Sequence, residues 1–102
     1  MTEIRFRQRR GFLQGKYELS MSGHADFCPG NDTLCAALSS LFFSLCNYLD
    51  DIGCSPIVKY EPGKAYILCS GGIRVRRAFE FVLYAFSMLE RAYPDNVRVN
   101  EL

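Results

Sequence analysis

The residues best suited to chemistry, His24 and Cys35, stand at the two ends of an irregular segment. An imidazole beside a thiol is the minimum apparatus of a cysteine nucleophile, because the base removes the thiol proton and later protonates the leaving amine. Asp32 is well placed to cap a helix, and Cys35 would then be its third residue. Free amides at a helix start stabilise a thiolate, and they could also hold the oxyanion of a tetrahedral intermediate.

The position of Cys35 on this predicted helix determines whether its side chain can meet the preceding loop. The predicted core stripe consists of Leu34, Leu38, Leu41, Leu45 and Ile52, with Phe42 and Leu49 beside it. At about 100° per residue, Cys35 lies about 90° from the centre of the stripe, with Ser39 one turn above it. A side chain at that border can face the loop that carries His24. A packed structural cysteine and a histidine bonded to backbone remain alternative interpretations.

A metal site is a further interpretation of the same segment. His24, Cys28 and Cys35 could surround zinc together with Asp26 or Asp32, although this spacing matches no recognised zinc module. The five cysteines cannot all pair within one chain, and no CxxC pair is present. Reduced thiols in a cytoplasmic protein are therefore predicted. No metal or other cofactor is expected.

The remaining residues must position this segment, and their periodicity predicts five strands and two helices. Alternation indicates a first strand over about residues 2–9, paired as an antiparallel hairpin with a second that contains Tyr17, Leu19 and Met21. A helix from Asp32 to about Gly53 follows, and a second helix ends before Pro94. The other strands contain residues 57–60, 66–69 and 97–99, with a turn at 61–64. The prediction is one α+β domain over 1–102, in the order β-β-α-β-β-α-β, with two helices on one face of a mostly antiparallel sheet.

Charge gives little indication of a partner. Twelve Lys and Arg against eleven Asp and Glu leave a net charge of +1, so no general attraction to nucleic acids or membranes is expected. Arg5, Arg7 and Arg9 form one face of the first strand, which is interpreted as a solvated face, with contact to ribosomal RNA or to an acidic partner as the alternative. The longest uncharged stretch, Thr33 to Leu49, contains polar residues and is shorter than the about 20 apolar residues of a spanning helix. Neither a membrane nor direct nucleic-acid binding is predicted.

Two short motifs carry a family resemblance. Gly23-His24-Ala25, followed by Gly30-Asn31-Asp32-Thr33-Leu34-Cys35-Ala36-Ala37-Leu38-Ser39, resembles the ribosomal-processing cysteine protease family called Prp. The likeness extends over the whole chain in length and element order. It implies that His24 is the general base and Cys35 the nucleophile. Asp32 and Ser39 match the family's other characteristic polar positions.

The resemblance also implies a substrate. Members of this family are small cytoplasmic homodimers that remove a short N-terminal extension from large-subunit ribosomal protein L-twenty-seven during ribosome biogenesis. Phe27 is a candidate lining of an apolar substrate cleft, and Gly30 is expected at positive φ just before the helix. The segment between His24 and Cys35 is expected to close over the bound peptide. The alternative function is a non-catalytic, ribosome-associated binding module.

Overall fold

A computed structural model describes residues 1–23 and 32–102, and its elements follow the order expected from the sequence. The five strands are β1 (Thr2–Arg10), β2 (Gly15–Ser22), β3 (Ile57–Glu61), β4 (Lys64–Gly71) and β5 (Val97–Glu101). The two helices are α1 (Asp32–Asp51) and α2 (Ile73–Ala92). Gly53 follows α1 with a φ of +82°, as expected for a left-handed residue at a helix end.

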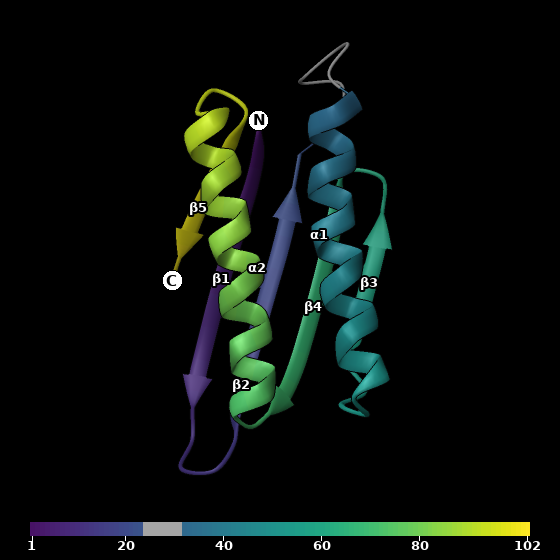
Figure 1. Cartoon of the computed structure of the whole chain (residues 1–102), viewed down its shortest axis with the longest axis vertical. Helices are drawn as coiled ribbons and strands as arrows, with labels where there is room; N and C mark the ends of the chain where they lie inside the picture. Colours follow the sequence, from purple (N-terminus) through teal and green to yellow (C-terminus); the bar gives the residue numbers. More distant parts are fainter. Residues whose placement is uncertain (24–31) are drawn as a thin grey trace.

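The strands form one sheet in the order β3-β4-β2-β1-β5. β1 pairs with β2, β2 with β4 and β4 with β3 in antiparallel fashion, whereas β5 lies parallel to β1. Both helices cover the same face of this sheet, and within the described residues the opposite face carries no helix (Figure 1). The predicted α+β arrangement, including the first hairpin, is confirmed.

The core lies between the helices and the covered face of the sheet. Its largest wholly buried side chains come from both helices and from four strands: Ile4, Leu19, Leu34, Phe42, Leu45, Leu49, Ile67, Val75, Phe79, Phe86 and Val97. Ring stacking joins the layers, since the ring of Phe79 lies 5.6 Å from that of Tyr17 and 5.9 Å from that of Phe6.

The buried stripe of α1 differs from the predicted one. Phe42 and Leu49 are fully buried, whereas Leu41 and Ile52 are only partly buried at its margin. The stripe is therefore turned toward Cys35, which lies about 60° from its centre at about 100° per residue. The cause is that α1 rests on the sheet with its largest fully buried side chain, the ring of Phe42, directed into the core.

By length and composition, Thr33–Asp51 of α1 is apolar enough to cross a membrane. In this structure its most apolar face packs against the sheet and α2, through Leu34, Leu38 and Leu45 among others. Core packing thus accounts for one face of α1, which is the 33% of that segment that is buried.

A close approach of strand and helix occurs where β4 ends. Ser70 and Gly71 continue β4 beyond the predicted residues 66–69, and Gly72 alone links the strand to α2. A Cβ on Gly71 would lie 2.4 Å from Cγ2 of Val75, so glycine lets the first turn of α2 rest on the strand.

Candidate active site

A cavity of about 120 Å³ lies at the end of the sheet where α1 begins. Cys35, Leu38 and Ser39 line it from the first turns of α1. The sheet supplies the rest of the wall: Thr2 of β1, Met21 and Ser22 of β2, Gly23, and Tyr60, Gly63, Lys64 and Ala65 of the β3–β4 hairpin. The predicted nucleophile therefore faces a hollow built from four strands.

Two contacts fix the β3–β4 hairpin beside α1. The ring of Tyr60 packs 4.9 Å from the ring of Phe43, which in turn meets the buried ring of Phe42 at 5.3 Å. The backbone N–H of Gly23 donates a hydrogen bond to the carbonyl of Gly63 at 3.0 Å. These contacts hold the hairpin, the end of β2 and the start of α1 around one cavity.

Gly23 has a φ of +131°, a conformation that side chains with a Cβ rarely adopt. This angle turns the chain where it leaves β2, while the hydrogen bond to Gly63 anchors the turn. Gly23 itself lines the Cys35 cavity. The glycine of the Gly-His-Ala motif thus has a geometric role in this site.

The cysteines differ in their surroundings. Cys35 is half-buried in the first turn of α1, as its fourth residue because the helix begins at Asp32. Cys46 and Cys69 are buried, and burial raises the pKa of each thiol to about 11. Of the cysteines in the described part of the chain, only Cys35 lines the cavity. The positive end of a helix at that position favours a thiolate.

The structure brings together Gly23, Cys35 and Ser39 of the predicted site residues. His24, Phe27 and Gly30 lie outside the described residues, as does the predicted closing segment. Asp32 begins α1, but its side chain, and with it the predicted cap, also lies outside the description.

The structure adds residues that the sequence did not single out. Tyr60 and Lys64 flank the β3–β4 turn and reach the cavity because β4 lies next to β2 in the sheet. Thr2 reaches it from the start of β1. The only sequence signal for these residues is their place at strand ends, and it does not indicate which strand ends meet α1.

Metal binding finds no support among residues 1–23 and 32–102, where no three potential ligands of the His, Cys, Asp and Glu types gather. His24, Asp26 and Cys28 of the zinc interpretation lie outside these ranges, so that interpretation is not tested by the structure.

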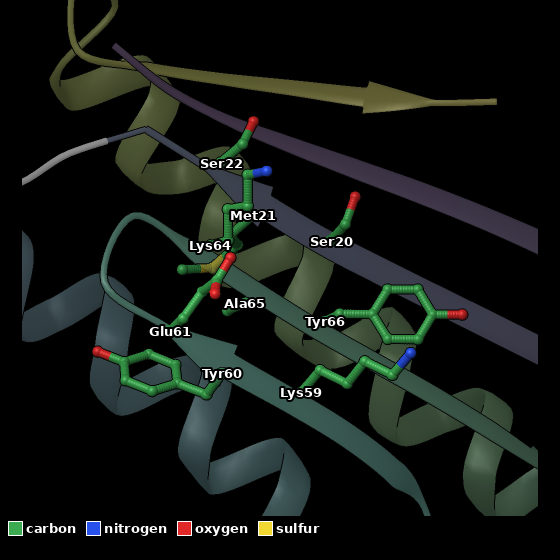
Figure 2. A pocket seen from close by; sticks show the side chains of 9 residues that line it. All are labelled: Ser20, Met21, Ser22, Lys59, Tyr60, Glu61, Lys64, Ala65 and Tyr66. Atoms are coloured by element: carbon green, nitrogen blue, oxygen red, sulfur yellow. The ribbon is translucent and has the colours of Figure 1, made fainter.

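A second hollow of about 450 Å³ lies on the other face of the sheet, over β4 and its neighbours. Figure 2 shows its lining, with Ser20 from β2, Tyr66 from β4 and Lys59 from β3 side by side. Tyr66 donates a 2.5 Å hydrogen bond to Glu18, and this bond raises the pKa of the tyrosine above its usual value.

Known proteins resemble this chain in fold and in sequence. The Prp protease of S. aureus, described as an essential ribosomal processing protease, matches with a TM-score of 0.83 and 21% identity in complex with a covalently linked product peptide. The same protease with a substrate peptide gives a TM-score of 0.79, again at 21% identity, and in both cases the match covers 100% of each chain.

The protein SMU.848 from Streptococcus mutans matches with a TM-score of 0.78 and 24% identity, covering 100% of this chain and 97% of the other. No curated protein matches the chain. The family model for cysteine protease Prp matches residues 1–98. The chain therefore belongs to the Prp family of cysteine proteases.

Proposed function

We propose that this protein is a cysteine endopeptidase that removes the short N-terminal extension of large-subunit ribosomal protein L-twenty-seven, with Cys35 as nucleophile and His24 as general base. The observation that carries the proposal is the placement of Cys35 in the first turn of α1, lining a cavity whose rim includes Gly23. His24 follows Gly23 directly in the chain, so one Cα–Cα step of about 3.8 Å separates it from that rim.

The chemistry follows that of cysteine proteases in general. His24 removes the Sγ proton of Cys35, and the thiolate attacks the scissile carbonyl carbon. The tetrahedral intermediate then collapses, the C–N bond breaks, and the imidazolium gives its proton to the leaving amine. Water, deprotonated by the same imidazole, hydrolyses the thioester and releases the second product with the free thiol. Amides of the first turn of α1 would stabilise the oxyanion.

Asp32 and Ser39 would support this pair. A carboxylate at the start of α1 caps the helix or orients an imidazole, and both uses favour the charged form of a neighbouring His. Ser39 lies one turn above Cys35 on the same side of α1 and lines the same cavity. Its hydroxyl would hydrogen-bond a substrate backbone group beside the thiol.

The substrate assignment is supported by the relatives. The S. aureus protease of the same fold is described as a ribosomal processing protease and is seen with a substrate peptide and with a covalently linked product peptide. A covalent product matches the thioester route, because an acyl-enzyme lies on it.

The decisive measurement is mass spectrometry of the L-twenty-seven precursor after incubation with the protein. The wild-type chain should release the N-terminal extension, and Cys35→Ala should release none while remaining folded, because Cys35 is small and lies at the border of the core. Cleavage by Cys35→Ala at the wild-type rate would overturn the proposal. Binding of the precursor without any cleavage by the wild-type chain would indicate the ribosome-associated binding module instead.

The role of His24 has its own test. His24→Ala should lose most of the activity, and the pH profile for iodoacetamide labelling of Cys35 should move toward alkaline pH, since the chain has no second histidine. An unchanged labelling profile would show that the two side chains do not interact.

We also propose that the protein is a homodimer in the cytoplasm. An apolar helix face, formed by Tyr48 of α1 and by Ile73, Phe81, Tyr84 and Met88 of α2, is exposed beside a groove of about 590 Å³ between the helices. Exposed apolar side chains of this kind, with Arg74 and Arg77 beside them in the groove, are suited to burial against a second copy. The free thiols of Cys46, Cys54 and Cys69 agree with a reducing compartment, which cell fractionation would test.

The dimer is tested by light scattering on size-exclusion chromatography. Phe81, with 72% of its surface exposed, is the variant site, and Phe81→Asp should convert the dimer to a monomer. Phe12, which is fully exposed in the β1–β2 loop, supplies the matched control, and Phe12→Asp should stay dimeric. A wild-type chain that runs as a monomer would overturn this part of the proposal.

A further inference from the structure

The face of the sheet that carries no helix gathers basic side chains from all five strands. Alternation places Arg5, Arg7 and Arg9 of β1 on this face, since Ile4 and Phe6 between them are buried in the core. Pairing brings the others onto it: Lys16 of β2, Lys59 of β3, Lys64 of β4 and Arg98 of β5. All seven of these side chains are exposed.

Acidic side chains offset only part of this charge. Glu3, Glu18 and Glu61 are the carboxylates on the same face, so its net charge is +4, from seven basic and three acidic groups. The whole chain carries only +1, which means that the remainder is acidic overall. The tertiary structure thus separates charge that the composition averages away.

Ion pairing neutralises few of these groups. Glu3 accepts from Arg5 at 2.6 Å, and Glu18 accepts the hydroxyl hydrogen bond of Tyr66. Within residues 1–23 and 32–102, Arg7, Arg9 and Arg98 make no ion pair. On β1 the arginines recur at every second residue, about 6.7 Å apart.

Tyr66 of β4 lies within this basic surface, between β3 and β2. Tyr66 lines the hollow of about 450 Å³, where Lys59 is its direct partner across the β3–β4 pair. Figure 2 shows the ammonium end of Lys59 beside the ring of Tyr66, with Ser20 on the other side. The hollow combines a ring for stacking with cations that suit a phosphate.

We propose that this open face, defined by the seven basic residues and Tyr66, binds single-stranded RNA. Guanidinium groups bind phosphates through paired hydrogen bonds, and a regular row of them follows a backbone that carries charge at regular intervals. A flat sheet with a basic surface and an aromatic ring is the usual platform for unpaired bases. The face meets the cavity of Cys35 at the β3–β4 hairpin, where Lys64 lines both that cavity and the hollow of about 450 Å³. The arginines of β1 do not line the cavity, so RNA on that row would leave it open to a peptide.

The test measures binding of a fluorescent 20-nucleotide oligouridine by anisotropy, across a salt series that starts at 50 mM. For wild-type protein, the logarithm of the binding constant should fall linearly with the logarithm of the salt concentration. The slope is about −0.7 for each phosphate contact, and its size should indicate several contacts. The variant Arg7→Gln/Arg9→Gln/Arg98→Gln should bind about tenfold more weakly at low salt, and its slope should be smaller by about 2. Peptide cleavage by this variant should be unchanged, which separates the RNA proposal from the proteolytic one.

A control of equal charge lies on the helical side. Arg74→Gln/Arg77→Gln/Arg91→Gln removes three exposed arginines from α2 and should leave RNA binding within about twofold of wild type. Because Arg74 and Arg77 line the groove of the proposed dimer, light scattering first establishes that this variant has the same oligomeric state as wild type. Equal weakening by both triple variants would overturn the proposal, because net charge alone would then explain the binding. Failure of wild-type protein to bind at 50 mM salt would overturn it as well.

The aromatic contribution and the class of partner are tested separately. Tyr66→Leu should weaken binding about tenfold, whereas Tyr66→Phe, which keeps the ring and loses the hydrogen bond to Glu18, should bind as wild type does. A 20-residue polyglutamate peptide should compete poorly. Competition as strong as that of the oligouridine would overturn the RNA assignment and point to an acidic protein.

Discussion

A thiol reacts as its thiolate, so the surroundings of each cysteine decide which one can act as a nucleophile. Burial holds Cys46 and Cys69 in the protonated form, and the thiol of Cys69 also donates a weak hydrogen bond to the carbonyl of Cys54 at 3.8 Å. Cys35 differs from both, because it is half-buried, lines a cavity and lies at the positive end of α1.

These differences predict selective alkylation. At pH 7.5, iodoacetamide should modify Cys35 at least about tenfold faster than Cys46 or Cys69, because the two buried thiols with a pKa of about 11 supply almost no thiolate. Peptide mapping by mass spectrometry resolves the individual sites. Equal rates at Cys35 and Cys46 would show that helix position and exposure do not activate Cys35.

A second residue-scale prediction concerns Gly23. Gly23→Ala places a Cβ at a φ of +131° beside the Cys35 cavity, and it should lower both the cleavage rate, by about tenfold, and stability, by about 1–2 kcal/mol. Gly53→Ala is the matched control, since Gly53 also has a positive φ, of +82°, but lies at the far end of α1 with open space around it. The Gly53→Ala variant should lose a similar amount of stability and should cleave the substrate at the wild-type rate. Full activity in Gly23→Ala would mean that this turn does not set the site.

At the scale of elements, the side chains between each helix and the sheet determine how closely that helix packs on the sheet. Helix α1 is positioned by Phe42, whose ring is fully buried, and by the contact between Phe43 and the hairpin residue Tyr60. The first turn of α2 comes close to β4 through the contact between Gly71 and Val75. Both approaches depend on side-chain volume, because interiors are closely packed.

The approach of α2 is tested by substituting neighbouring glycines. Gly71→Ala should lower the free energy of unfolding by about 1–3 kcal/mol, because its Cβ would lie 2.4 Å from Cγ2 of Val75. Gly72→Ala meets only the carbonyl oxygen of Leu13, at 3.6 Å, and should cost less than about 1 kcal/mol. Urea denaturation gives both values, and equal losses would indicate a backbone effect rather than overpacking.

At the scale of the whole molecule, the buried thiols couple stability to alkaline pH. An ordinary thiol here would ionise near 9.0, whereas Cys46 and Cys69 ionise in the folded protein at about 11. Below pH 9 both thiols are therefore protonated in the folded protein and in the unfolded protein. Above it the unfolded chain releases protons that the folded chain keeps, so unfolding becomes easier.

The expected result is a fall in the free energy of unfolding of a few kcal/mol, about 4 kcal/mol at most, as the pH rises from 9 to 11. The double variant Cys46→Ala/Cys69→Ala should show a smaller fall over the same range, although it is less stable at pH 7 because two core side chains are shortened. Identical pH slopes for the two proteins would assign the effect to other groups.

Local patterns in the sequence determined the elements and their class. Strand alternation and helical periodicity each depend on which neighbouring residues share a face, so they predicted five strands, two helices and the antiparallel β1–β2 hairpin. The same reasoning placed Cys35 and Ser39 on one side of α1, near its start. It missed the rotation of α1 toward Phe42, because packing against the sheet, rather than the wheel alone, selects the side chain that lies deepest.

Only the tertiary structure decided which distant elements meet. Pairing of β4 with β2 brings Tyr60 and Lys64 to the cavity of Cys35, and pairing of β5 with β1 brings Arg98 to the row of arginines. Neither pairing is contained in a local pattern, because strands far apart in the chain are matched by the burial of a shared core. The candidate nucleophile was thus identified from the sequence, whereas the walls of its cavity and the separation of charge were set by the fold.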